Sequence, residues 1–376
     1  GPGKAMVEAT CTKCHGLNFI TNSFGFSRDE WVRLFSTMVT PPQAETNAIA
    51  DYLAKNFAEK PDIPKAKIIT GPVTVNFKEW QAPTLGSRPH DPLAARDGSL
   101  WWTGQYQSRL GRVDVRTGAL KEYPLDTPNS GPHGLVEDKD GNIWFTGNHA
   151  ALIGKLDPQT GITTEYKIPD PKVKDPHSLS FAPDGILWFT AQQSNTVGRL
   201  DPKTGEMKLV TMPTPRSRPY GIIVSPKGVP TLCLFGTNKL ATINPNTMEI
   251  REYALPDAAS RPRRIAIVGD EVWYSDFSRG FLGRYNIATG AHKEWASPSG
   301  PQSQPYGIVF AKGAIWYNES FAKPNTIVRF DPKTEKFQSW AIPGGGDIVR
   351  KMDVTPDGNP VTANSLTNQV GLVEIK

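Results

Sequence analysis

A turn followed by an aromatic strand recurs seven times between residues 98 and 365, and this repeat limits the fold more than any other feature of the chain. The clearest copies are GSLWWTG, GNIWFTG, GILWFTA, DEVWYSD and GAIWYNE, and two degenerate copies, GVPTLCLFG and GNPVTANS, fill the gaps. The aligned central residues, 41 to 45 residues apart, are Trp101, Trp144, Trp188, Leu232, Trp273, Trp316 and Val361. A period of this length with four strand-like pieces is typical of one propeller blade.

A second phrase of the repeat, such as IGKLDPQTG, carries a turn between two strands, and a third, such as TEYKIPDP, follows it. The last unit ends at VGLVEIK without a third phrase, whereas an extra copy, KEWQAP, begins at residue 78, before the first unit. We therefore predict an all-β, seven-bladed propeller over residues 71–376. Residues 74–80 should supply the outer strand of the last blade, because such closure leaves no exposed sheet edge.

The chain before residue 58 has a helical pattern instead. SRDEWVRLFSTM begins with a capping box formed by Ser27 and Glu30, and QAETNAIADYLAKNF shows an apolar helical face. Three prolines mark EKPDIPKAKIITGP. We predict a small all-α domain over residues 4–58 and a linker over 59–70.

The pentapeptide CTKCH at residues 11–15 is the attachment motif of c-type haem. Cys11 and Cys14 would bond the haem covalently, and His15 would bind the iron on one side. A redox dithiol or half of a zinc site are the alternatives, but no second cysteine pair and no preceding strand support them. Met38 is the candidate for the opposite axial position, with Met6 as its competitor and a role as core filler as the alternative.

The order of CTKCH, then Trp31 and Met38, then IADYLA at residues 49–54 resembles small class I cytochrome c domains over about 55 residues. This resemblance implies one haem c, electron transfer and a redox partner protein. Haem c is attached outside the cytoplasm, so we expect a bacterial periplasmic protein. The opening Gly1-Pro2-Gly3 resembles the scar of a cleaved tag, so the missing signal peptide carries no information about export.

A polar residue precedes the innermost strand of each predicted blade and should face the propeller axis. The ring consists of His90, His133, His177, Tyr220, Arg263, Tyr306 and Arg350. Three histidines could bind a divalent or transition metal, or could simply form hydrogen bonds at the strand entries. The arginines near this mouth, which also include Arg218, Arg261 and Arg264, indicate an anionic or carbonyl-bearing ligand, with salt bridges as the alternative.

A second ring lies three residues after each aromatic position: Gly104, Gly147, Ala191, a residue near 236, Asp276, Glu319 and Asn364. Its acids fall on the blades of Arg263 and Tyr306. One side of the axis could therefore present imidazoles, and the other carboxylates with guanidinium groups.

The repeated phrases GPHGL, IWFTGN, IGKLDPQTG and RPYGI resemble the virginiamycin B lyase (streptogramin lyase) propellers over about 300 residues. The resemblance implies a magnesium-assisted elimination in which a histidine base on the sixth blade opens a cyclic depsipeptide at its ester bond. Here Tyr306 stands at the position of that base, Arg263 at that of a substrate-binding histidine, and Gln304 at that of a metal-binding carboxylate. Only Glu319 is in place as a metal ligand, and a tyrosine is a poor base at neutral pH.

Charge and hydropathy exclude two kinds of interaction partner, nucleic acid and the membrane interior. The 42 basic and 37 acidic residues are spread without a basic run, so we expect no nucleic acid, and no apolar stretch is long enough to span a membrane. Three functions stay open: an oxidoreductase acting on a small, anionic organic substrate at the propeller mouth with electrons leaving through the haem; a lyase with an accessory haem; and a non-enzymatic electron-transfer or docking module.

Overall fold

Four helices precede the propeller in the computed structural model, which describes residues 2–13, 16–23 and 25–376. They are α1 (Pro2–Cys11), α2 (Asn18–Thr21), α3 (Arg28–Ser36) and α4 (Gln43–Asn56). The predicted capping box is confirmed, because the Ser27 side chain accepts from the Glu30 amide while the Glu30 carboxylate accepts from the Ser27 amide at 2.8 Å. Cys14 and His15 lie outside the described residues.

The helices enclose a small apolar core of their own. Its buried members include Val7, Trp31, Phe35, Ile49 and Leu53, so each of the three longer helices contributes to it. Glu59 and the prolines that follow lead into an extended segment instead of a fifth helix. Because the four helices are short, their arrangement alone does not identify the class of this domain.

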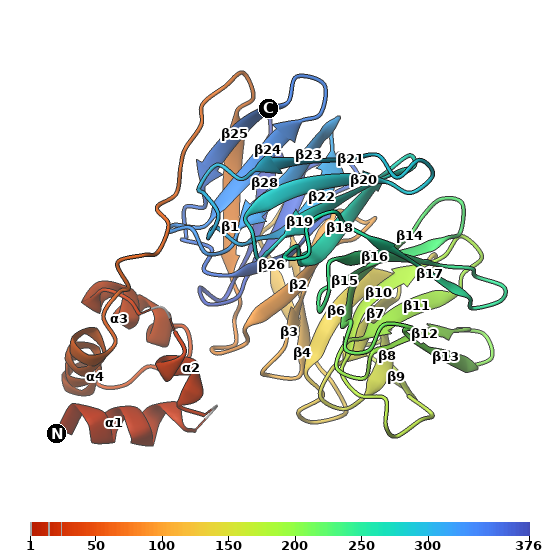
Figure 1. The fold of residues 1–376 in the computed structure, drawn as a ribbon. Helices are drawn as coiled ribbons and strands as arrows, with labels where there is room; N and C mark the ends of the chain where they lie inside the picture. The colour runs from red at the N-terminus through yellow and green to blue at the C-terminus, as the bar shows by residue number, and fades with distance from the viewer. Residues whose placement is uncertain (1, 14–15, 24) are drawn as a thin grey trace.

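Seven four-stranded antiparallel sheets follow and form the predicted propeller (Figure 1). The first three blades are β2 (Pro89–Ala94), β3 (Ser99–Gly104), β4 (Arg109–Asp114) and β5 (Leu120–Pro124); β6 (Pro132–Glu137), β7 (Ile143–Gly147), β8 (Leu152–Leu156) and β9 (Thr163–Lys167); and β10 (Pro176–Phe181), β11 (Leu187–Ala191), β12 (Thr196–Leu200) and β13 (Met207–Thr211).

The next three blades have the same order from the innermost to the outermost strand. They are β14 (Pro219–Val224), β15 (Pro230–Leu234), β16 (Lys239–Ile243) and β17 (Ile250–Ala254); β18 (Pro262–Val268), β19 (Glu271–Asp276), β20 (Phe281–Asn286) and β21 (His292–Ala296); and β22 (Pro305–Ala311), β23 (Ala314–Glu319), β24 (Thr326–Asp331) and β25 (Lys336–Ala341).

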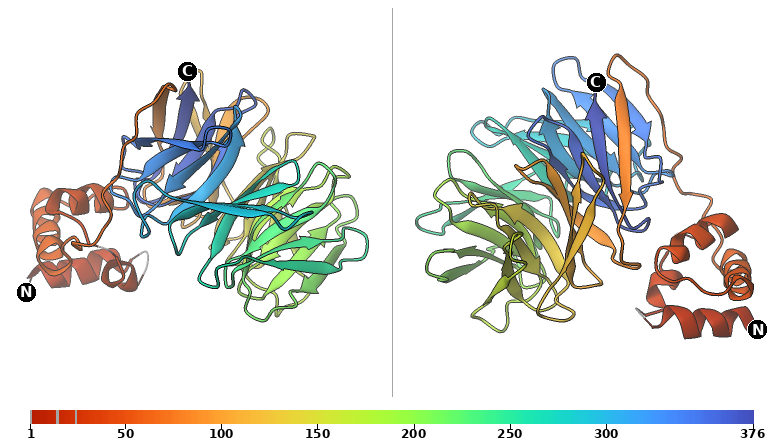
Figure 2. Two further views of the ribbon diagram at one scale, coloured as in Figure 1. Left: turned by 45° about the horizontal axis from the view of Figure 1, so that its top comes forward. Right: turned by 180° about the vertical axis from the view of Figure 1, so that it is seen from behind.

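The seventh blade joins both ends of the propeller. It consists of β26 (Val349–Val354), β27 (Pro360–Asn364), β28 (Gln369–Ile375) and β1 (Val75–Gln81). β1 pairs with β28 from Val75 opposite Ile375 to Gln81 opposite Gln369, and the two strands lie side by side in Figure 2. The extra repeat copy before the first unit thus supplies the outer strand of the last one.

Aromatic rings explain why the repeat keeps its tryptophans. Trp101 of β3 stacks on Tyr123 of β5, with 5.2 Å between the ring centroids, and Trp273 stacks on Trp295 at 5.4 Å. Each stack joins the second and the outermost strand of one blade. In the fourth blade the degenerate repeat misled the sequence alignment: β14 and β15 pair Ile223 with Thr231, so Thr231 occupies the position assigned to Leu232.

The linker runs along the sixth blade before the chain enters β1. The Ala66 amide donates to the Lys323 carbonyl at 3.0 Å, and the Ile69 amide donates to Ser339 Oγ at 2.9 Å. The helical domain contacts the propeller directly as well, since the Gly86 amide donates to the Thr37 carbonyl at 2.7 Å. No helix among the described residues is long and apolar enough to cross a membrane.

Candidate functional site

A β-bulge positions the axial ring. In all seven blades the register between the innermost strand and its neighbour shifts after the first residue of the inner strand. In the first blade, for example, Pro89 lies opposite Gly104 but Pro92 lies opposite Trp102. The ring residues, including His90, occupy these bulges. A bulge re-aims the side chain of its extra residue, which explains how seven strands bring their polar residues together.

The three histidines and the first tyrosine of the ring lie in one row. The ring centroids are 3.8 Å apart between His90 and His133, 3.9 Å between His133 and His177, and 3.9 Å between His177 and Tyr220. A hydrogen bond between the hydroxyl groups continues the row from Tyr220 to Tyr306. The structure therefore brings all of these predicted residues together.

The three histidines are neutral. Burial, reinforced by nearby arginines, lowers the pKa of His90, His133 and His177 well below its ordinary range. Nδ1 of His90 lies 2.9 Å from Asp91 Oδ1, and Nδ1 of His133 lies 3.1 Å from the His177 carbonyl. Because carboxylate and carbonyl oxygens accept hydrogen bonds, these two rings carry their proton on Nδ1 and leave the Nε2 lone pair available.

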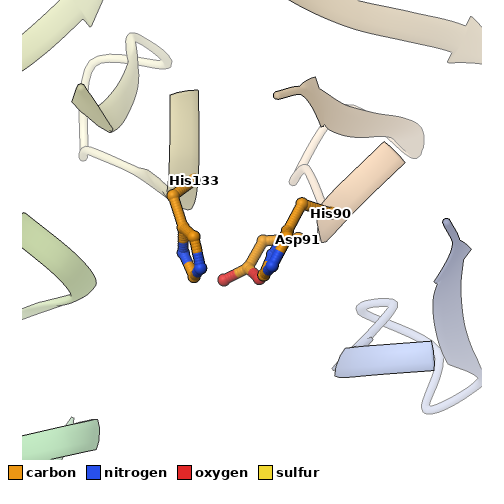
Figure 3. Close-up of side chains that lie close together, drawn as sticks. All are labelled: His90, Asp91 and His133. Carbon is orange, nitrogen blue, oxygen red and sulfur yellow. The ribbon is translucent and has the colours of Figure 1, made fainter. Parts of the chain in front are cut away.

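His90, Asp91 and His133 could hold a metal ion. Their ligand atoms all lie within 4.8 Å of one another, and Figure 3 shows the side chains pointing toward one another from adjacent strands. His177 is not part of this group. Asp91 also faces two cations, with 3.3 Å between its Oδ1 and Arg264 Nη2 and 3.8 Å between its Oδ2 and Lys351 Nζ. The same carboxylate therefore already neutralises basic side chains.

Arg263 occupies the other half of the ring. Its guanidinium lies over four aromatic rings, with 3.9 Å to the Tyr306 centroid, 4.1 Å to Phe277, 4.4 Å to Phe235 and 5.2 Å to Tyr220. Burial raises the pKa of Tyr306, so this hydroxyl stays protonated at neutral pH. Arg350 donates to Ser365 Oγ, which follows β27 in the same blade.

The acids of the second ring do not pair with these arginines. Asp276 accepts from Arg279 at 3.1 Å, and Glu319 accepts from the Ser299 amide at 2.8 Å and from Thr326 at 2.7 Å. The alternative in which the mouth arginines form salt bridges with Asp276 and Glu319 therefore finds no such pair among the described residues, although Arg264 pairs with Asp91. The fourth member of this ring is Leu234, which lies opposite Pro219, and not a residue near 236.

A cavity of about 810 Å³ lies between the helical domain and the mouth of the propeller. Its helical wall includes Cys11, Met38 and the apolar side chains of Ile20, Phe26, Trp31, Leu34, Phe35 and Leu53. Its propeller wall includes Arg88, Tyr106, Arg263, Gln304, Tyr306 and Arg350. The volume falls within the range of about 300–1,000 Å³ that is typical of small-molecule sites.

The helical wall of this cavity fits a haem group. Cys11 of the attachment motif lines it together with Met38, and the helical lining between them combines apolar side chains with the polar Lys13, Asn18, Asn22, Ser23 and Thr37. Met6 packs into the helical core and is not among the lining residues. A half-apolar wall with one thiol and one thioether would suit a covalently attached haem.

Sequence reasoning missed Arg88, Asp91 and Gln105. Arg88 Nη1 donates to Gln105 Oε1 at 2.7 Å, and its guanidinium lies 4.4 Å from the Tyr106 centroid. The tripeptide SRP occurs before three of the inner strands and could have drawn attention to Arg88. No sequence pattern singled out Asp91, because its role depends on the bulge and on contact with Arg264, which lies 173 residues away in the chain.

These features define a class, a seven-bladed propeller with a polar axial ring and a helical domain at its mouth. Residues 64–323 match the model of the virginiamycin B lyase family, so the chain belongs to that family. The match begins after the last helix and therefore says nothing about the helical domain. A comparison with curated protein sequences finds no match.

Solved structures agree with this assignment. Virginiamycin B lyase from Staphylococcus aureus is 23% identical with a TM-score of 0.73, and the match covers 80% of this chain and 99% of that one. A streptogramin B lyase is 25% identical with a TM-score of 0.73, covering 80% and 98%. Hydrazine synthase from Kuenenia stuttgartiensis is 14% identical with a TM-score of 0.63, covering 77% and 96%, which shows a shared fold only.

Proposed function

We propose that this chain is a periplasmic c-type haem protein that exchanges electrons with a small organic molecule bound at the propeller mouth. One observation carries the proposal: a single cavity is lined by Cys11 and Met38 from the helical domain and by Tyr306 and Arg350 from the propeller. A reactant and an electron carrier in one cavity need no diffusional encounter, which is a proximity advantage.

Four residues would hold the haem. Cys11 and Cys14 would form the thioether bonds, and His15 and Met38 would bind the iron. When bound, haem with histidine and methionine ligands supplies one-electron transfer, because thioether ligation favours electron transfer over oxygen chemistry. A redox partner protein would accept or deliver the electrons.

The propeller side chains would bind and orient the small molecule. Tyr306 and Gln304 line the cavity, and the hydrogen bond between the hydroxyl groups of Tyr306 and Tyr220 connects this wall to the row of neutral imidazoles. The apolar side chains of the helical wall, such as Phe35 and Leu53, would limit the access of water to part of the cavity. A protonated tyrosine can donate a hydrogen bond to a carbonyl or carboxylate oxygen of the bound molecule and keep its own proton.

The haem midpoint potential tests whether haem and propeller share the cavity. Tyr306→Phe removes one hydroxyl from the cavity wall and keeps the ring over Arg263, so the potential should shift. Tyr166→Phe is the matched control. Tyr166 lies in β9, the outermost strand of the second blade, where it stacks on Trp144, and it does not line the cavity. Equal potentials in both variants and the parent protein would refute the shared cavity.

A lyase is the second candidate, and membership of the virginiamycin B lyase family favours it. Two observations weigh against it. The Tyr306 hydroxyl, at the position of the base, stays protonated, and both Glu319 oxygens already accept hydrogen bonds from Ser299 and Thr326. Chromatography after incubation with magnesium and quinupristin would reveal a ring-opened product if this candidate were correct.

A further inference from the structure

The cavity has a marked imbalance of charge. Its described lining includes four cationic side chains, Lys13, Arg88, Arg263 and Arg350, and no carboxylate. We infer that Arg88, Arg263 and Arg350 form a binding site for the carboxylate groups of an organic anion. The role of that anion as the reactant rests on the proposed function, whereas the binding site itself needs only the propeller side chains.

None of the three arginines has an acidic partner within the described part of the chain. Arg88 donates to the Gln105 amide oxygen at 2.7 Å, Arg350 donates to Ser365, and Arg263 donates to the Tyr220 hydroxyl at 3.4 Å. All three of these partners are neutral.

Two other arginines of the propeller, the buried Arg264 and the half-buried Arg279, are neutralised by carboxylates. Arg264 pairs with Asp91 at 3.3 Å, although it lies next to Arg263 in the sequence. Arg279 contacts three carboxylates, those of Asp257, Asp276 and Glu294, at 2.9 to 3.2 Å. Arg264 and Arg279 thus have counter-ions, whereas the described residues supply none to the three arginines of the cavity.

Arg263 is held in place with its hydrogen-bonding capacity largely unused. Four aromatic rings surround its guanidinium at 3.9 to 5.2 Å, and its Nε is buried without a partner in the described residues. A guanidinium has five N–H donors, and within the described residues one of them is engaged, in the bond to Tyr220. A rigid cation with free donors is prepared for a ligand before the ligand arrives.

The positive charges of the cavity arginines also repel one another. Burial, together with the charge of Arg88, lowers the pKa of Arg350 to about 9. Removing a charge from water without a counter-ion is costly, and a bound anion would offset that cost. A metal cation at this end of the axis would add to the repulsion.

The geometry of the guanidinium group points to carboxylates. Its planar fork matches a carboxylate in a bidentate pair, which a lysine cannot reproduce. Two sources could supply this chemistry, a free organic acid or the propionate groups of the haem itself. Three guanidinium groups around one cavity suit an anion with two carboxylates.

Succinate is the probe, with uncharged succinamide as its control. Isothermal titration calorimetry at constant ionic strength would measure succinate binding to the full-length haem-loaded protein and to the full-length Cys11→Ala/Cys14→Ala variant. We expect succinate to bind and succinamide not to bind. Arg263→Lys and Arg350→Lys should weaken binding by about tenfold or more, since a charge-assisted hydrogen bond is lost. Arg112→Lys is the control, because Arg112 pairs with Asp97 away from the cavity.

The pattern of binding identifies the source of the carboxylate. Binding to both forms, or to the haem-loaded form alone, supports a free organic acid, and binding to the haem-free variant alone supports the propionates. No binding to either form, or equal binding by the Arg→Lys variants and Arg112→Lys, overturns the inference. Circular dichroism confirms that each variant is folded. If the parent protein lacks haem by mass but still binds succinate, the proposed function fails while the carboxylate site stands.

Discussion

Arg33 of α3 and Asp347 of the loop before β26 form an ion pair, with 3.5 Å between Nη2 and Oδ2, that joins the helical domain to the seventh blade. Asp347 is only 6% exposed. Burial raises the pKa of its carboxyl to about 6 in spite of attraction from Arg33 and Lys323, and repulsion from Glu30 adds to the increase. The next residue, Ile348, lines the cavity, so this contact lies at its edge.

Asp347 should make stability depend on pH. Because its pKa in the folded protein lies above the ordinary value of 3.8, its contribution is fully present below pH 4 and is lost as the pH rises through about 6. We expect a loss of about 1–3 kcal/mol in the free energy of unfolding. The Asp347→Asn variant should not show this loss when its free energy of unfolding is measured in urea between pH 4 and 8. Asp175, whose pKa is also raised to about 6, is present in both proteins and cancels in the comparison. Parallel pH profiles would contradict the assignment.

Met38→Ala should remove the thioether that we propose as an iron ligand. We expect the weak thioether-to-iron absorption band of the oxidised protein to disappear and the reduction potential to fall. Met6→Ala is the control, because Met6 packs inside the helical core and not along the cavity. Persistence of the band in Met38→Ala would show that another group binds the iron.

The closing strand should be needed for a stable propeller. A chain that lacks residues 1–70 keeps β1, whereas a chain that lacks residues 1–81 leaves the edge of β28 unpaired. Phe77 and Trp80 pack against the cores of the last and first blades, so we expect the shorter chain to lose about 2–4 kcal/mol and to aggregate. Equal urea midpoints for the two chains would contradict this closure.

Elemental analysis should find the haem iron as the only stoichiometric metal. Asp91 neutralises Arg264 and Lys351, which leaves little negative charge for an ion at His90 and His133. A second equivalent of zinc, copper or iron that is lost in His133→Ala would establish the His90–Asp91–His133 group as a metal centre instead.

Much of this architecture could be predicted, because a blade is a local unit with its own sequence period. The seven repeats and the extra copy before them predicted both the number of blades and the closing strand. The fourth blade was misaligned by one residue, since Leu232 stands in a copy that lacks the tryptophan. The β-bulge at the start of each inner strand was not predicted from the sequence. This bulge turns His90 and the equivalent residues toward the axis.

The cavity could not be predicted, because it depends on how two domains pack. Arg88 and Gln105 come from loops, and their role becomes visible only beside Phe19 and Tyr106. Likewise, no sequence pattern distinguishes Arg264, which has the buried partner Asp91, from Arg263, which has none among the described residues. Such differences arise from contacts between residues that are far apart in the chain.

We propose that a haem is covalently bound in the cavity between the helices and the propeller. Intact-mass measurement of the protein, produced in cells that attach haem c in the periplasm, tests it most directly. We predict a mass increase of one haem in the parent protein, with a c-type visible spectrum, and no increase in Cys11→Ala/Cys14→Ala. An unmodified mass for the parent protein under conditions that mature a known c-type cytochrome would show that no haem is attached at Cys11 and Cys14.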